Sequence, residues 1–157
     1  MTSSDERTLY LEDLEIGRRT TSGPFAVSAD EIKAFGERWD DRPWHVDEVA
    51  AERSIFGGLV ASGAHVIAIF TRLSLDAQRK DGAAATLAGL GVEIRLEKPV
   101  RPGDRLDYRG EVVEKRESKS RPDAGIVRTR HELVNQDGEV AFVATSSSLV
   151  GRRPSGG

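Results

Sequence analysis

Residues 54–78 read SIFGGLVASGAHVIAIFTRLSLDAQ, and this stretch decides which kind of fold the chain can adopt. Its first 18 residues, 54–71, carry no formal charge and are long enough to suggest a membrane span. Three glycines, two serines and a histidine within them argue against that interpretation. Apolar residues instead recur at helical spacing over residues 62–78 and surround the first turns. We therefore expect a loop that leads into a helix enclosed within a soluble fold.

A second helix is expected before this segment. Residues 28–31 (SADE) form a capping-box pattern, in which a serine hydroxyl and a glutamate carboxylate bind exposed amides at a helix start. Apolar residues at helical spacing extend this helix to Trp39. Residues 40–46 are expected to form a loop, because Pro43 pushes the residue before it toward an extended conformation. A further short helix is expected over residues 48–53.

The second half of the chain changes to the two-residue period of β-strands. Apolar and charged residues alternate there, so each strand is expected to have one solvated face. Residues 135–138 (NQDG) predict a hairpin turn, in which the glycine supplies a positive φ angle. The expected strands cover residues 18–27, 92–97, 106–112, 125–134 and 139–149. One enclosed helix against an antiparallel sheet is an α+β arrangement.

Length and composition indicate one domain. The chain has 157 residues, and we expect the domain to cover residues 9–150, between disordered ends at 1–8 and 151–157. The absence of cysteine excludes disulfides, thiolate catalysis and zinc–thiolate sites, and fits a cytoplasmic location. The 23 basic residues are outnumbered by 26 acidic ones, so nothing favours nucleic acid as a partner. The polar, acidic N-terminus does not resemble a secretory signal.

The three histidines differ in their surroundings. His131 lies in an expected strand, where a surface or half-buried position is the ordinary interpretation. His65 lies in the apolar helix, where a hydrogen-bonded core histidine is expected. His45 follows Asp40 by five residues in a loop that Pro43 stiffens, and a carboxylate with an imidazole can take a proton from water and return one near neutral pH. The spacing alone has little specificity, since a turn-capping aspartate and a solvated histidine would look the same.

The loop before the central helix adds to this pair. Residues 56–63 (FGGLVASG) lead directly into the helix, so free backbone amides are expected near Ser62 and Gly63. A helix N-terminus stabilises negative charge that develops on a carbonyl oxygen. Together these features suggest chemistry on an activated carbonyl compound, although tight helix–sheet packing would also explain the glycines.

These segments, in this order and at these separations, resemble the MaoC-like dehydratases, which include the (R)-specific enoyl-CoA hydratases of the hot-dog fold. The resemblance covers most of the folded chain. Its motifs are FAVS at 25–28, DDRPWHVD at 40–47, FGGLVASG at 56–63, KPVRPGD at 98–104 and the hairpin at 135–138. It implies a curved antiparallel sheet wrapped around the helix, and a homodimer in which two protomers form one continuous sheet.

The resemblance also assigns a substrate and residue roles. The substrate would be an acyl-CoA or acyl-carrier thioester, in a lyase reaction of fatty acid metabolism. Asp40 would be the base that activates water for addition at C3 of an enoyl thioester, and His45 would orient that water and assist proton delivery at C2. The backbone amide of Gly63 would bind the thioester oxygen. No cofactor or metal is implied, since CoA is part of the substrate, and neither is a membrane partner.

Two residues depart from the usual pattern of the family. Arg42 stands where asparagine is common, and could pair with Asp40 or Asp41, or meet a phosphate or carboxylate of the substrate. Ser62 stands in place of the histidine of a common Ala-His-Gly sequence, and its hydroxyl could orient Asp40 or the substrate carbonyl. Substrate choice is therefore less well defined than the class of reaction.

Two alternative functions stay open. A hot-dog acyl-CoA thioesterase would share the fold, but such enzymes usually place an acid near the start of the central helix, where this chain has none before Asp76. A non-catalytic acyl-thioester-binding subunit would keep the substrate tunnel without turnover. The presence of both Asp40 and His45 argues against that alternative, because a site without catalysis has no chemical need for the pair.

Overall fold

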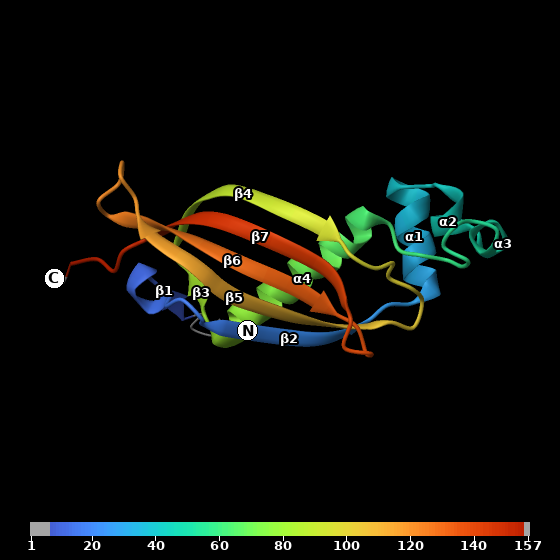
Figure 1. The fold of residues 1–157 in the computed structure, drawn as a ribbon, viewed down its shortest axis with the longest axis horizontal. Helices are drawn as coiled ribbons and strands as arrows, with labels where there is room; N and C mark the ends of the chain where they lie inside the picture. The colour runs from blue at the N-terminus through green and yellow to red at the C-terminus, as the bar shows by residue number, and fades with distance from the viewer. Residues whose placement is uncertain (1–6, 156–157) are drawn as a thin grey trace, which may run out of the picture.

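The computed structural model describes residues 7–155 and shows one curved sheet with a long helix across it (Figure 1). The helices are α1 (Ala29–Trp39), α2 (Pro43–Val46), α3 (Glu48–Glu52) and α4 (Gly63–Asp81), and a 3₁₀ turn covers Leu11–Asp13. The strands are β1 (Thr8–Leu9), β2 (Arg19–Ala26), β3 (Ala83–Ala84), β4 (Thr86–Leu96), β5 (Arg105–Glu117), β6 (Ala124–Val134) and β7 (Val140–Gly151). The α+β class is therefore confirmed, together with the hot-dog arrangement of a long helix on an antiparallel sheet.

The main sheet has the strand order β2-β5-β6-β7-β4, and its neighbouring strands are antiparallel. The β6–β7 hairpin turns at the expected residues. The Asn135 side chain accepts hydrogen bonds from the amides of Asp137 and Glu139 at 3.0 Å, and Gly138 has a φ angle of 76°. The order leaves β2 at one edge of this sheet and β4 at the other.

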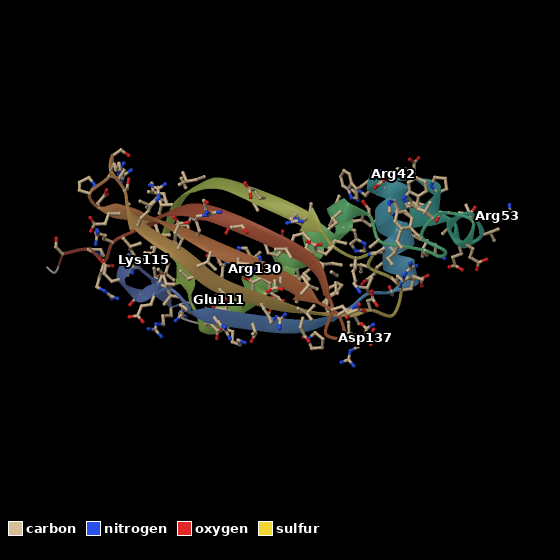
Figure 2. The ribbon with its side chains drawn as sticks, viewed as in Figure 1. Arg42, Arg53, Glu111, Lys115, Arg130 and Asp137 are labelled. Atoms are coloured by element: carbon tan, nitrogen blue, oxygen red, sulfur yellow. The ribbon has the colours of Figure 1, made fainter. Side chains whose placement is uncertain are left out.

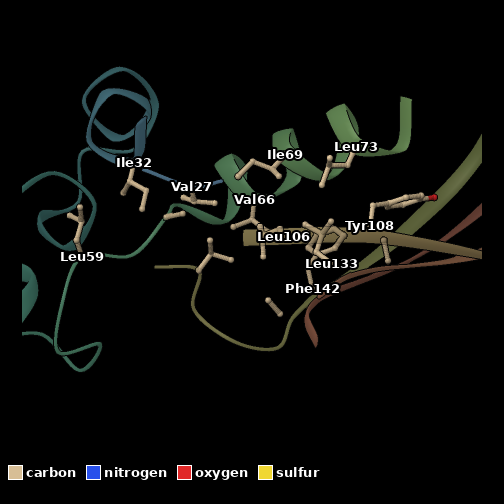
Figure 3. Close-up of a cluster of buried hydrophobic side chains, with 14 of the residues drawn as sticks. Val27, Ile32, Leu59, Val66, Ile69, Leu73, Leu106, Tyr108, Leu133 and Phe142 are labelled. Atoms are coloured by element: carbon tan, nitrogen blue, oxygen red, sulfur yellow. The ribbon is translucent and has the colours of Figure 1, made fainter. Parts of the chain in front are cut away.

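The face of α4 that meets the sheet forms one side of the core (Figure 3). Val66, Ile69 and Leu73 recur at helical spacing, and each is only 3% exposed. They belong to one cluster with Leu106 of β5 and Phe142 of β7, which are fully buried. Burying an apolar side chain of this size stabilises the fold by about 1.5–3 kcal/mol, so this face fixes the position of α4.

The opposite face of α4 is not enclosed, which corrects the expectation from the sequence. Ile67 and Leu75 are 36% and 39% exposed, because α4 packs mainly on β2 and β5 and the sheet covers only one side of it. The expected core face of β4 is exposed as well, at Val92, Ile94 and Leu96. Apolar periodicity identifies the apolar face of a helix or strand, but it does not identify what covers that face. Within residues 7–155, no helix is both long and apolar enough to cross a membrane.

The two ends of the described chain are more ordered than expected. Thr8 pairs with Ala83 in a short parallel ladder, although residues 1–8 were expected to be disordered. At the other end, Gly151 is the last residue of β7, Arg152 donates to Glu117 at 2.7 Å and Arg153 donates to Asp13 at 2.8 Å. Charged side chains therefore hold a segment that composition alone assigned to a disordered tail. Residues 1–6 and 156–157 lie outside the described residues.

His131 on β6 is half-buried, as expected, and joins three strands through hydrogen bonds. Its ring nitrogens each lie 2.8 Å from a hydroxyl oxygen, that of Tyr108 on β5 and that of Ser146 on β7. Phe70 of α4 packs edge-on against the ring, with 5.1 Å between ring centroids. This burial lowers the pKa of His131 to about 4.

Protonation of His131 should make the fold less stable in acid. The unfolded histidine binds a proton near pH 6.5 and the folded one near pH 4, so the unfolded state takes up its proton first as the pH falls. We expect a loss of about 3 kcal/mol in the free energy of unfolding between pH 7 and pH 4. Urea titrations across this range measure the loss, and His131→Gln should remove it. An equally steep decline in the variant would assign the acid sensitivity to other groups.

Candidate active site

The C-terminal end of α1 and the single turn of α2 bring Asp40 and His45 together. Asp40 is the C-cap of α1, and its backbone N–H donates to the Gly36 carbonyl at 2.8 Å. Pro43 begins α2, where its fixed φ angle suits the first helical position. This turn leaves His45 only 4% exposed. The expected loop at residues 40–46 therefore contains one helical turn, and that turn buries the histidine.

Gly36 allows α1 and α2 to approach closely, a role that the sequence analysis did not identify. A Cβ atom at this position would lie 2.8 Å from Cγ1 of Val46 and 3.1 Å from the carbonyl oxygen of His45. Because one of these contacts is to backbone, a side chain there would have to displace α2. The only signal in the sequence is a glycine within an amphipathic helix.

Three side chains surround the Asp40 carboxylate. Nε and Nη2 of Arg42 donate to its two oxygens, both at 2.6 Å. Oγ of Ser62 donates to Oδ2 at 2.7 Å, and Nε2 of His45 lies 3.4 Å from the same oxygen. The Asp40 side chain is 13% exposed and that of Arg42 is 60% exposed. Arg42 lies at the end of the molecule formed by α1–α3 (Figure 2). Of the two aspartates considered for Arg42, Asp40 is its partner.

These contacts hold the pKa of Asp40 well below its usual range. The hydrogen bonds from Arg42 have the largest effect, and burial opposes them. The hydrogen bond from Ser62 and the charge of His45 lower the pKa further. The same pairing raises the pKa of Arg42. Asp40 is therefore ionised at any pH near neutrality.

His45 is fixed in one orientation by the chain that leads to α4. Its Nδ1 lies 2.6 Å from the carbonyl oxygen of Val60. A carbonyl oxygen can only accept a hydrogen bond, so Nδ1 carries a proton and donates it. Nε2 is then the nitrogen that faces Asp40. This geometry suits a group that exchanges a proton with a water or substrate held beside Asp40.

Ser62 and Gly63 form the start of α4 beside this pair. Ser62 is 2% exposed, and while its hydroxyl donates to Asp40 it accepts a weak hydrogen bond from the Ala64 amide at 3.3 Å. The Gly63 amide makes no hydrogen bond within residues 7–155. The first amides of a helix have no partner within the helix. The Gly63 N–H is therefore available to a ligand.

A cavity of about 360 Å³ lies beside these groups. Its wall includes Arg42, His45, Gly63, Val66, Leu96 and Lys98. Asp40 and Ser62 are not in the wall; Asp40 contacts the wall residues Arg42 and His45 from behind, and Ser62 donates to Asp40. The structure thus brings all five expected site residues together, with the carboxylate one layer behind the surface of the cavity.

The other two histidines lie outside this site, since neither is in the cavity wall. His65 is buried, but its Nδ1 has no hydrogen-bond partner, which corrects the expectation of a hydrogen-bonded core histidine. Its ring stacks on Phe35 with 4.7 Å between centroids, and burial lowers its pKa. Among the described residues, no group of three or more histidines and carboxylates is placed to hold a metal ion.

Comparison with known proteins gives consistent matches. The sequence pattern described as MaoC like domain matches residues 14–135. An uncharacterized protein of Bacillus subtilis, YdeM, is 29% identical over 147 residues, which cover 92% of this chain and all of that protein. A 3-hydroxybutyryl-CoA dehydratase of Methylorubrum extorquens is 32% identical over 109 residues, which cover 69% of this chain and 66% of that protein. The crystal structure of a MaoC-like dehydratase from Rhodospirillum rubrum has a TM-score of 0.86 at 43% identity, covering 94% of this chain and 99% of that one.

Proposed function

The chain belongs to the MaoC-like family, and from that premise we propose that it hydrates enoyl thioesters of CoA. In the opposite direction the same site would dehydrate 3-hydroxyacyl thioesters. One observation carries the proposal: His45 and the free Gly63 amide lie in the wall of one cavity, with the Asp40 carboxylate 3.4 Å behind the imidazole. A base, an acid and an oxyanion donor are the groups that addition of water to an enoyl thioester requires.

Binding would begin at the N-terminus of α4. The thioester oxygen accepts a hydrogen bond from the Gly63 N–H, and the helix dipole favours the negative charge that grows on this oxygen. One such donor is worth about 10²–10³ in rate in enzymes where it has been removed. Val66 and Leu96 supply apolar wall for the acyl group. The acyl carbon chain then lies beside His45.

The chemical step adds water across the C2–C3 double bond. A water held by Asp40 and Nε2 of His45 attacks C3, and Asp40 takes the proton that the water loses. The π electrons move toward the thioester oxygen, where the Gly63 amide stabilises them. The proton that Asp40 took then passes by way of Nε2 of His45 to C2, which leaves Asp40 ionised again. A C3–O bond and a C2–H bond form, and one water O–H bond and the π bond break.

This reaction moves no electrons to an acceptor outside the substrate, so we propose that it needs no redox cofactor, with CoA serving only as the carrier of the acyl group. We also assign the polarisation of the carbonyl to the Gly63 amide rather than to a metal ion. Activity that survives dialysis against EDTA supports this assignment. Loss of activity that zinc or magnesium restores would overturn it.

Gly36→Ala should lower this activity without unfolding the chain. Alanine favours a helix over glycine by about 1 kcal/mol, which offsets part of the strain from displacing α2. We expect a shift of only a few degrees in the melting temperature but a fall in kcat of about tenfold or more, because a small displacement of His45 disturbs the reacting geometry. Glu37→Ala, at the exposed neighbouring position, is the matched control. Full activity in Gly36→Ala would mean that the α1–α2 contact relaxes harmlessly.

The thioesterase alternative lacks its usual acid in this site. No acidic residue lies in the first turn of α4, and Asp76 forms ion pairs with Arg72 and Arg79 near the other end of the helix. The alternative of a non-catalytic binding subunit does not explain why Arg42, Ser62 and His45 converge on one oxygen atom of Asp40. Both alternatives nevertheless predict binding of an acyl thioester, so turnover distinguishes them from the proposal.

The proposal is tested by mixing the purified protein with crotonyl-CoA and following the absorbance of the conjugated enoyl thioester. Hydration lowers this absorbance without releasing thiol, and the product is 3-hydroxybutyryl-CoA. A thiol reagent in a parallel sample detects hydrolysis. Release of free CoA would replace the proposal by the thioesterase alternative, and binding without either reaction would replace it by the binding subunit.

We also propose a homodimer that forms through β4. This strand is at the edge of the main sheet, and all eleven of its residues are exposed in the single chain. An exposed edge strand with apolar side chains is a ready template for pairing with another strand. Pairing two copies about a twofold axis would join two sheets into one and cover the apolar face at Val92, Ile94 and Leu96.

A further inference from the structure

The Arg42 side chain is hydrogen-bonded to the carboxylate of Asp40, which is the base of the proposed reaction. A carboxylate offers about four acceptor sites, and two hydrogen bonds from Arg42 with one from Ser62 fill three of them. Arg42 is in the wall of the cavity, whereas Asp40 is not. Only about one acceptor site is left, so a water at C3 of a bound thioester gains fuller access to Asp40 once the guanidinium has moved.

The Arg42 side chain is placed so that it can move. It is 60% exposed and extends from the residue before α2, over the ring of Trp44 at 5.9 Å. A planar guanidinium binds any carboxylate in the same bidentate geometry, through two parallel hydrogen bonds. A second carboxylate would therefore compete with Asp40 directly.

Resting on the proposed function, we propose that the substrate is the thioester of a dicarboxylic acid, and that its free carboxylate draws Arg42 away from Asp40. The guanidinium contacts the same carboxylate that must hold the attacking water, so a carboxylate attached just beyond C3 of the substrate lies within its reach. Lys98, the other cationic side chain among the described wall residues, pairs with Glu139 instead of with the base. Binding of such a substrate would thus release Asp40 from Arg42 at the moment when C3 comes to lie beside Asp40. An uncharged acyl chain has no carboxylate to draw Arg42 away.

Two pairs of thioesters test this inference. Crotonyl-CoA and glutaconyl-CoA differ by one terminal carboxylate, and both carry the reactive double bond. Butyryl-CoA and glutaryl-CoA are their saturated analogues, which bind without reacting. We expect the wild type to have a kcat/KM at least tenfold higher for glutaconyl-CoA than for crotonyl-CoA, and to bind glutaryl-CoA at least tenfold more tightly than butyryl-CoA in calorimetry.

Arg42→Gln should abolish both preferences and raise kcat for crotonyl-CoA severalfold, because it uncovers Asp40. Arg42→Lys should restore only part of the preference, since an ammonium group lacks the planar fork. Arg38→Gln, which removes an arginine of α1 that lies over Trp39, is the matched control and should change neither ratio. A variant Arg42→Gln that slows both substrates equally would make Arg42 only a support for Asp40, and would overturn the inference.

The two proposals fail in different ways. If the wild type has the same kcat/KM for crotonyl-CoA as for glutaconyl-CoA, the proposed function stands and the proposal of a dicarboxylate substrate is overturned. A wild type that hydrates neither, yet binds glutaryl-CoA more tightly than butyryl-CoA through Arg42, overturns the hydratase and supports recognition of the second carboxylate. Equal binding of the two saturated thioesters overturns that recognition, whatever the turnover.

Discussion

Asp40→Asn should abolish hydration of enoyl thioesters, with kcat reduced by about 10²–10⁴-fold. The asparagine has the same size and keeps an oxygen that can accept the hydrogen bond from Ser62, but it cannot take a proton from water. Because the Arg42 guanidinium is 60% exposed, solvent can take the place of the lost carboxylate, and the loss of stability should not exceed about 3 kcal/mol. The variant should therefore fold, bind the thioester and fail to turn it over. Initial rates with the preferred enoyl-CoA, together with calorimetric binding of its saturated analogue, measure both expectations.

The neighbouring aspartate provides the control. Asp41→Asn removes one carboxylate from the same short segment, at an exposed position. It should leave kcat within about twofold of the wild type, since exposed surface changes away from a site have small effects. If Asp40→Asn were as active as Asp41→Asn, the assignment of Asp40 as the base would be wrong, and the reaction would need another proton acceptor.

Local signals in the sequence predicted the elements that hold the site. Ser28 caps α1 by accepting the Glu31 amide at 3.1 Å, as the pattern at residues 28–31 indicates. The turn at residues 135–138 and the period of two in the strands also depend on neighbours in the chain, so they could be predicted from short stretches. Helical spacing placed the start of α4 near Ser62, and the structure begins this helix at Gly63 with Ser62 as its N-cap.

Features that depend on how the short helices turn and pack were predicted less well. The interpretation of Arg42 left three partners open, and only the folded turn of α2 places its guanidinium on Asp40. The role of Gly36 depends on how closely α2 approaches, which no pattern within α1 specifies. His65 was expected to find a hydrogen bond, but its Nδ1 is buried without a partner. The site was therefore predicted as a set of residues, and of its contacts only those of Ser62 and Arg42 with Asp40 were among the stated alternatives.

The exposed face of β4 links the proposed assembly to the site. Leu96 is the last residue of the strand, lines the cavity and lies so close to Gly63 that a Cβ there would be 2.9 Å from its Cδ1. In the single chain Leu96 is 56% exposed. A partner that covers β4 would therefore also exclude water from one wall of the cavity. Excluding water strengthens the electrostatic interactions on which the oxyanion donor and the base depend.

The double variant Val92→Glu with Ile94→Glu should convert the dimer to a monomer. A twofold interface repeats each substitution, so four carboxylates would be buried without partners, and we expect dimerisation to weaken by at least about 1,000-fold. Light scattering should give the wild type about twice the 17.1 kDa mass of the chain, and the variant the single mass. Glu93→Gln, on the opposite side of the strand, is the control and should remain dimeric.

A monomeric wild type at micromolar concentration would contradict the homodimer, and would leave β4 to a different chain. If the wild type is a dimer, the activity of the double variant separates two roles of the interface. A folded monomer with full kcat would mean that β4 pairing serves stability alone. We expect kcat to fall instead, because Leu96 and the start of α4 would then form a cavity wall open to water, while the contacts of Asp40 with Ser62 and His45, which lie within one chain, would remain.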